Sequence, residues 1–93
     1  MLVGSVEIKL FIGQAGSLKE KRHILKSLKD NVHNKFNASV AEVDGLDKWQ
    51  SAVIGVAVVG GEKNHVMSVL TNLIEYIKTF RNVQLVDYYM EIY

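Results

Sequence analysis

The spacing of apolar residues in this chain alternates between the period of a strand and the period of a helix. Residues 2–12 carry apolar side chains at every second position, which is typical of a strand with one buried face. Residues 18–36 repeat them at intervals of three and four, as an amphipathic helix does. Helical spacing returns after residue 63, and a segment rich in β-branched and aromatic residues closes the chain.

Turn and capping residues set the expected bounds. The first helix is predicted to begin at a capping box, Ser17 with Glu20, and to end at residue 34 or 35. The other elements are expected to be a short strand at 38–44, a strand apolar on both faces at 50–59, a second helix from an Asn64 cap to before Asn82, and a last strand at 83–93.

The order of these elements is β-α-β-β-α-β. With right-handed crossovers, this order folds into a four-stranded antiparallel sheet of order 4-1-3-2 with both helices on one face. The predicted fold class is therefore α+β, a ferredoxin-like sandwich. A length of 93 residues leaves little room for more than one such domain, so residues 1–93 are expected to form a single domain.

Composition excludes several classes of function. The chain has no cysteine, which rules out disulfides, thiol catalysis and cysteine-ligated metals. Its longest uncharged apolar run, around residues 52–59, is far shorter than the ~20 residues needed to span a bilayer. Residues 1–12 include Glu7 and Lys9 and follow no basic segment, so they are not expected to be a targeting signal. The expected location is cytoplasmic, with no membrane partner.

The first helix carries a segregated charge. Counting residues 19–35, six Lys and Arg against two acidic residues give +4, whereas the whole chain carries only +1. Lys21 is expected to flank the apolar stripe and to snorkel outward. The residues that fall on one line opposite that stripe are Lys19, Arg22, Lys26, Lys29 and His33. Such a row can follow nucleic-acid phosphates; the alternative is a solvated face that only aids solubility.

The second sheet face predicts self-association. Successive residues of 52–59 alternate between the two faces of the sheet. Only one of the two alternating sets can face the helices, so the other set must lie on the open face. A bare apolar stripe usually marks an interface, which favours a homodimer through the sheet face or a sheet edge. A monomer with scattered apolar surface is the alternative. The third strand has no aromatic residue, so the stacking platform of RNA-recognition domains is not expected.

No catalytic or metal motif stands out. Glu42, Asp44 and Asp47 offer oxygen ligands for a hard cation, but their spacing matches no EF-hand loop, and turn chemistry is the favoured explanation. The three histidines lack ligand spacing. Trp49 is expected to anchor its loop. The sequence therefore predicts no enzyme, no cofactor and no metal site.

Several segments resemble the YlxP-like family, a bacterial group of small domains of unknown function. They are Ser-Leu-Lys-Glu-Lys-Arg at residues 17–22, Ala-Glu-Val-Asp at 41–44, Asp-Lys-Trp-Gln at 47–50 and Gly-Val-Ala-Val-Val at 55–59. The resemblance implies a ferredoxin-like fold. It also implies RNA or ribosome association, because family genes often lie beside translation and ribosome-maturation factors. The loop at 13–16 lacks the proline expected there.

Three functional hypotheses follow. The first is a non-enzymatic accessory domain that contacts RNA or a ribosomal particle through Lys19, Lys21, Arg22, Lys26, Lys29 and His33. The second is a protein-interaction or dimerisation module that uses the open sheet face. The third is a small-ligand sensor resembling ACT domains, which share this topology and bind amino acids at dimer interfaces. The glycine-bearing loop at 13–16 suggests it, and the identity of the ligand is left open.

Overall fold

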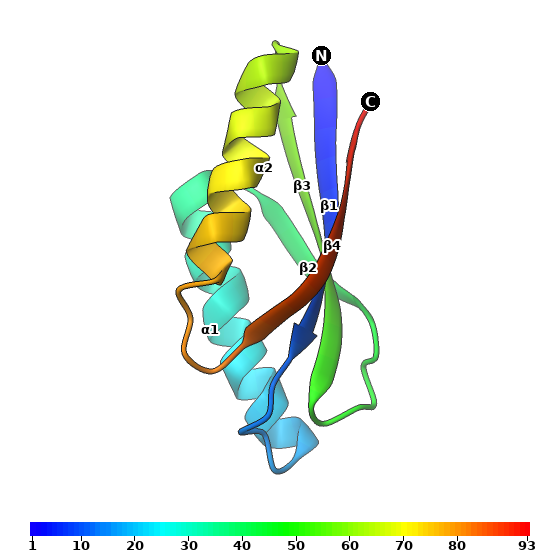
Figure 1. The fold of residues 1–93 in the computed structure, drawn as a ribbon, viewed down its shortest axis with the longest axis vertical. Helices are drawn as coiled ribbons and strands as arrows, with labels where there is room; N and C mark the ends of the chain where they lie inside the picture. Colours follow the sequence, from blue (N-terminus) through cyan, green and yellow to red (C-terminus); the bar gives the residue numbers. More distant parts are fainter.

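The computed structural model describes residues 1–93, and its elements follow the order β-α-β-β-α-β (Figure 1). Apart from the end of α2, the predicted bounds agree with the structure to within one or two residues. The elements are β1 (Leu2–Phe11), α1 (Leu18–Phe36), β2 (Ser39–Asp44), β3 (Ser51–Gly60), α2 (Lys63–Ile77) and β4 (Gln84–Ile92).

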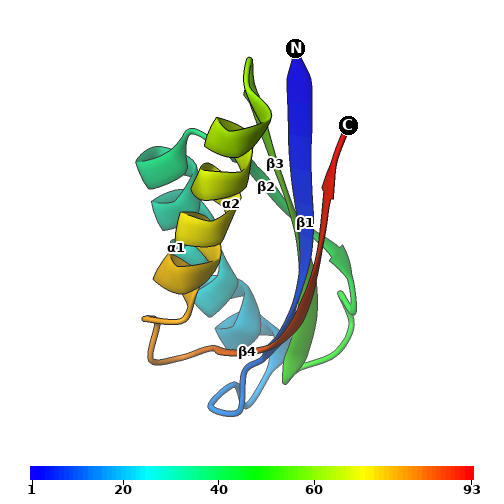
Figure 2. The same cartoon turned by 45° about the horizontal axis from the view of Figure 1, so that its top comes forward.

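The four strands form one antiparallel sheet of order β2-β3-β1-β4, which confirms the predicted topology. Both helices lie on the same face of this sheet, as Figure 2 shows from a second direction. α2 packs over the central strands β1 and β3, and α1 packs over β2 and against α2. The opposite face of the sheet is uncovered. None of the helices is long and apolar enough to cross a membrane.

The core lies between the sheet and the helices. Alternation along β3 places Ala52, Ile54, Val56 and Val58 in this core, which settles which parity faces the helices. The matching residues of β1 are also buried, since they sit opposite β3 on the same face. The two helices contribute Leu25, Leu28, Val32, Val66, Leu70, Leu73, Ile74 and Ile77.

The start of α1 is close to the predicted capping box. The Glu20 amide donates to Ser17 Oγ at 3.1 Å, as expected. The Glu20 carboxylate accepts from the Gly16 amide at 3.0 Å, one residue before the position that a capping box would use. At the other end, Asn37 adopts a left-handed conformation with φ of 51° and stops the helix.

The predicted Asn64 cap of α2 is wrong. Glu62 occupies the N-cap position and makes no side-chain hydrogen bond there. The Val66 amide donates to the Glu62 carbonyl at 3.1 Å, so the first helical turn starts from Glu62, two residues before Asn64. Asn64 therefore lies inside the first turn, where its side chain cannot cap the helix.

Gly4 marks the closest approach of α2 to the sheet. A Cβ at this position would collide with Val66 Cγ1 and would lie 2.9 Å from Leu70 Cδ1. Both contacts involve side chains that are buried in the core. The absence of a side chain at Gly4 thus sets the distance between the helix layer and β1.

We predict that Gly4→Ala lowers the free energy of unfolding by about 1–3 kcal/mol, because the added methyl overpacks the core. The matched control is Gly61→Ala, where a Cβ would meet no atom within 4 Å. Urea denaturation of both variants measures the difference. Equal effects of the two substitutions would show that α2 does not pack as described.

Candidate functional site

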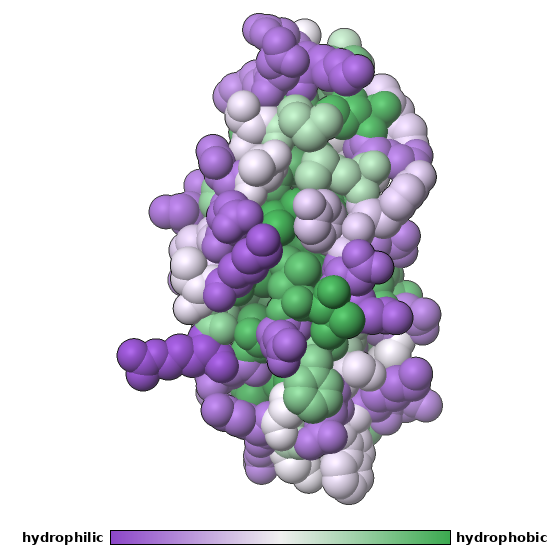
Figure 3. All heavy atoms as spheres, in the orientation of Figure 1, coloured by the Kyte–Doolittle hydropathy of each residue, from purple (hydrophilic) through white to green (hydrophobic).

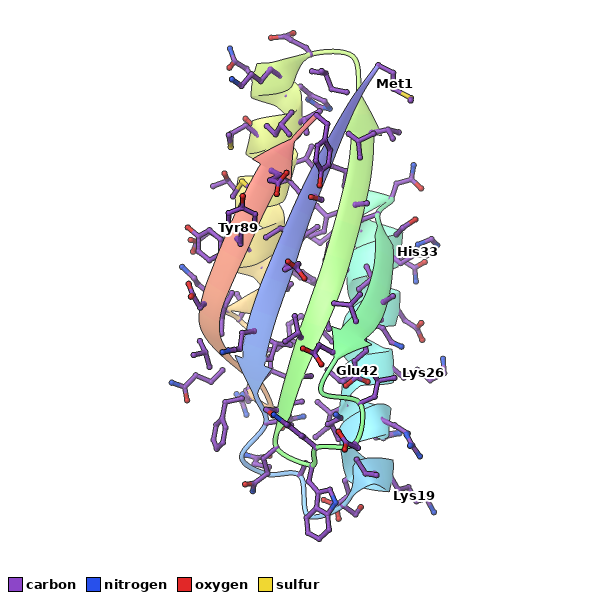
Figure 4. All side chains as sticks on the ribbon, turned by 90° about the vertical axis from the view of Figure 1, so that its right-hand side faces the viewer. Met1, Lys19, Lys26, His33, Glu42 and Tyr89 are labelled. Atoms are coloured by element: carbon purple, nitrogen blue, oxygen red, sulfur yellow. The ribbon has the colours of Figure 1, made fainter.

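The outer face of α1 points away from the sheet. The buried residues Leu25, Leu28 and Val32 occupy the opposite side of the helix, as the apolar spacing predicted. In Figure 4 the labelled side chains of Lys19, Lys26 and His33 project from α1 at the β2 side of the molecule. Lys19, Arg22, Lys26 and His33 are exposed and Lys29 is half-buried, so the five residues predicted to share a line lie on the accessible surface.

One cation of this line is already paired. Lys26 Nζ lies 2.8 Å from Asp30 Oδ2, one helical turn away. Their hydrogen bond, assisted by the charge attraction, raises the pKa of Lys26 and lowers the pKa of Asp30. Both groups are fully exposed, so the pair adds little stability. It makes Lys26 less available to an external anion, since a phosphate would compete with Asp30.

His33 also has a hydrogen-bond partner within the chain. Its Nδ1 lies 2.8 Å from the Ala38 carbonyl oxygen, to which it donates across the turn between α1 and β2. Nearby, Lys35 Nζ lies 5.1 Å from the centre of the Tyr76 ring on α2, within the range of a cation–π contact. The basic side chains near the C-terminal end of α1 therefore already contact other parts of the chain.

Three cations remain without a carboxylate partner. The structure has three ion pairs in all, and none of them includes Lys19, Arg22 or Lys29. Glu20, next to Lys19, is engaged by the Gly16 amide, and Asp30, next to Lys29, is paired with Lys26. From Lys19 to Lys29 the row extends over about 15 Å at 1.5 Å per residue. We call Lys19, Arg22 and Lys29 the basic row.

Lys21 does not belong to this surface, and the expectation that it snorkels outward is wrong. The side chain is completely buried, and its Nζ lies 2.8 Å from Glu42 Oε2 on β2. The same ammonium donates to the carbonyl oxygens of Gly45 at 2.8 Å and Ser51 at 3.2 Å. Lys21 thus fixes α1 to both sides of the β2–β3 connection.

The signal for this burial was present in the sequence. Lys21 stands three residues after Leu18 and four before Leu25, which is the spacing of the apolar stripe itself. A lysine at such a position either snorkels or finds buried oxygen atoms. The second outcome requires a carboxylate on a distant strand, and only the folded structure shows that Glu42 supplies it.

The acidic cluster of Glu42, Asp44 and Asp47 is a poorer candidate for a cation site than the sequence suggested, because Lys21 pairs with one of its three carboxylates. The Glu42 carboxylate is engaged by Lys21, and Asp44 Oδ1 accepts from the Gly45 amide at 2.8 Å. The chain contains no group of three acidic or histidine side chains close enough to hold a metal ion. Turn chemistry is therefore the better explanation of Asp44, while Gly45 follows with a positive φ of 73°.

Two loop expectations also change. Trp49 is 56% exposed, so the prediction that it anchors its loop is wrong. The loop at 13–16 borders a shallow hollow next to the start of α1, formed with Ser17, Lys19 and His23. The Gly16 amide in this loop already binds the Glu20 carboxylate, so it is not free for the carboxylate of an amino acid.

The open sheet face combines small apolar residues with acidic ones. β3 presents Val53, Gly55, Ala57 and Val59 there, as one of the two predicted parities. On β1 and β4 the same face carries Glu7, Lys9, Asp87, Tyr89 and Glu91, because these residues pair across the two strands. A hydrogen bond with Glu91 raises the pKa of Tyr89. The expected bare apolar stripe is thus limited to the β3 side of the face.

Comparisons with known proteins agree with this fold. A family model described as "Protein of unknown function (DUF503)" matches residues 3–90. The uncharacterized protein YlxP of Bacillus subtilis (strain 168) is 35% identical over 83 residues, which are 89% of this chain and 90% of that protein. A de novo designed protein with a ferredoxin fold superimposes with a TM-score of 0.58, at 19% identity, over 99% of this chain and 85% of the design.

We predict that Lys21→Met lowers the free energy of unfolding by about 3 kcal/mol, because it leaves Glu42 and two carbonyl groups without their buried partner. Replacing both residues, Lys21→Met with Glu42→Met, is expected to recover part of that loss. Urea denaturation measures both effects.

The matched control is Lys26→Met, which removes a lysine whose ion pair is fully exposed. It should change the stability by less than about 1 kcal/mol. If Lys21→Met proved as harmless as Lys26→Met, the buried ammonium would not hold α1 to the sheet.

Proposed function

This chain belongs to the DUF503 family, and from that premise we propose that it is a non-enzymatic accessory domain that binds RNA, free or within a ribosomal particle, on the outer face of α1. The observation that carries the proposal is the basic row. Lys19, Arg22 and Lys29 follow one side of a helix and have no carboxylate partner within the chain. Unpaired cations in a row are what a phosphate backbone neutralises.

The geometry of the row suits backbone contact. Lysine and arginine on an exposed helix face donate to phosphate oxygens without reading bases. A length of about 15 Å covers more than one phosphate, since phosphates follow each other at a rise of about 3.4 Å per nucleotide even in a strand of duplex DNA, and A-form RNA is more compact along its axis. Binding of this kind is directed by charge and shape, and it weakens steeply with salt.

The sheet face is a poorer surface for RNA. Its β1 and β4 half carries Glu7, Asp87 and Glu91 against Lys9, so it repels phosphates. Its exposed aromatic residues are Tyr89 on the edge strand β4, Tyr93 after it and Phe11 at the end of β1, while β3 has none, so they do not form the stacking platform on two central strands that RNA-recognition domains use. Charge therefore favours the helix side over the sheet side for an RNA partner.

We predict that the triple variant Lys19→Glu, Arg22→Glu and Lys29→Glu weakens RNA binding by more than about tenfold at low salt. The slope of log affinity against log salt should also become shallower by about 2, since each lost phosphate contact removes about 0.7–0.9 from it. Fluorescence anisotropy with a structured RNA fragment, at several salt concentrations, measures both quantities.

The control carries the same change of charge on other surfaces, as Lys48→Glu, Lys63→Glu and Lys78→Glu, which are all exposed. It should keep most of the affinity and of the salt slope. Circular dichroism checks that both triple variants fold. If the two variants lose affinity equally, or if neither does, the basic row is not the RNA contact.

A further inference from the structure

The β4 strand forms one edge of the sheet and is unusually suited to pairing. It follows β3 and β1 in the strand order, so one side of it has no partner strand. Its ladder with β1 is regular from Asp87 to Ile92, and a register shift interrupts it at Val86. An edge of this length that is not interrupted by proline or lysine is a template for another strand.

The ladder shows which backbone groups are free. Tyr93 and Val3 exchange both of their hydrogen bonds, at 2.8 and 2.9 Å, so the peptide groups of Tyr93 point toward β1. Because these directions alternate along an antiparallel strand, Glu91, Tyr89 and Asp87 also point inward. The amides and carbonyls of the residues between them therefore point outward: Tyr88, Met90 and Ile92. The Tyr88 amide donates to Asp87 Oδ1 at 2.8 Å, so a new strand would have to replace that carboxylate.

The side chains of Tyr88, Met90 and Ile92 lie on the helix side of the sheet, and the helices cover them only in part. α2 packs mainly over β1 and β3 and reaches β4 less. Tyr88 is 46% exposed, and Met90 and Ile92 are half-buried at the margin of the core. In Figure 3 hydrophobic side chains gather in the middle of this face, between α2 and β4. Apolar groups thus border the free edge directly.

The edge is complementary to itself in one register. If two copies pair antiparallel about Met90, the axis lies at the centre of residues 87–93. On the helix side Met90 then faces its own copy and Tyr88 faces Ile92. On the open face Tyr89 faces Glu91 and Asp87 faces Tyr93, so every carboxylate meets a phenol hydroxyl. A shift by one residue, centred on Tyr89, would instead oppose Asp87 and Glu91.

We propose that β4 binds β4 of a second copy of this chain, antiparallel and centred on Met90, to form a C₂ dimer with a continuous eight-stranded sheet. The outward amides and carbonyls of Met90 and Ile92 and the Tyr88 carbonyl supply the backbone hydrogen bonds, and the Tyr88 amide joins them by exchanging Asp87 Oδ1 for the Ile92 carbonyl of the second copy. The apolar margin between α2 and β4 becomes interior. Carboxylate–phenol pairs on the open face select the register.

This dimer has a consequence for the other surface. Antiparallel pairing of edge strands places the two-fold axis perpendicular to the sheet, so both helix layers stay on the same side. α1 packs over β2, at the far edge from β4, so the two basic rows would lie at opposite ends of one face. Two linked binding surfaces raise the apparent affinity for a long ligand.

A cysteine scan tests the register, because the chain has no cysteine of its own. In the proposed dimer the two copies of position 90 lie about 5.5 Å apart, and the two copies of position 92 about 14 Å apart. With a bismaleimide whose span lies between these distances, Met90→Cys should form a covalent dimer and Ile92→Cys should not. Equal crosslinking of both, or crosslinking of neither, would overturn the register.

Light scattering tests the association itself. The unmodified chain should have twice the monomer mass at micromolar concentration. Met90→Lys places two like charges at the axis and should weaken the dimer more than about tenfold, as should Tyr88→Lys at a more exposed position. The control is Val43→Lys, an exposed residue of the other edge strand β2, which should remain dimeric. A monomeric unmodified chain, or folded lysine variants of β4 that stay dimeric, would refute the proposal.

Discussion

A buried ammonium group determines how the two layers of this protein are held together. Lys21 comes from α1, and the oxygen atoms that surround it come from Glu42, Gly45 and Ser51, on both sides of the β2–β3 connection. A buried charge is costly unless it is paired and hydrogen-bonded, so these contacts admit only one placement of the helix against β2 and the hairpin. That placement in turn decides which residues of α1 face outward.

The surface that results is divided by charge. Lys19, Arg22 and Lys29 lie on the helix side without carboxylate partners, whereas Glu7, Asp87 and Glu91 lie on the open face of the sheet. A net charge of +1 conceals this division. The two faces therefore differ in the charge of the partner they suit, and the proposed RNA partner would be attracted to α1 by the field of the molecule. Pairing through β4 would leave both faces accessible, because it uses only the edge of the sheet.

The fold was predictable from the sequence because its signals are local. Alternation in β1, the capping residues Ser17 and Glu20, and the glycines after β3 each act within a few residues, and the topology rules then fix the strand order. Two of the errors arise where distant residues decide. Nothing near Lys21 shows that Glu42 lies beside it, and nothing near Trp49 shows that its ring is 56% exposed in the fold. The Asn64 cap failed for a local reason, because α2 begins one residue before it.

The candidate site was predictable only in outline. Helical spacing placed Lys19, Arg22 and Lys29 on one line, and the structure keeps them there. The same spacing could not show that Asp30 pairs with Lys26 or that His33 binds the Ala38 carbonyl, since both depend on side-chain conformations. The structure therefore reduces the candidate binding residues to the three cations of the basic row, Lys19, Arg22 and Lys29.

The measurement that most directly tests the central claim is isolation of the tagged chain from the cells that produce it, with and without nuclease treatment. We predict that RNA, with or without ribosomal proteins, accompanies the chain from untreated lysate and is lost after nuclease. Absence of RNA from both samples, or the same proteins remaining bound after the RNA had been removed, would contradict RNA binding by the basic row.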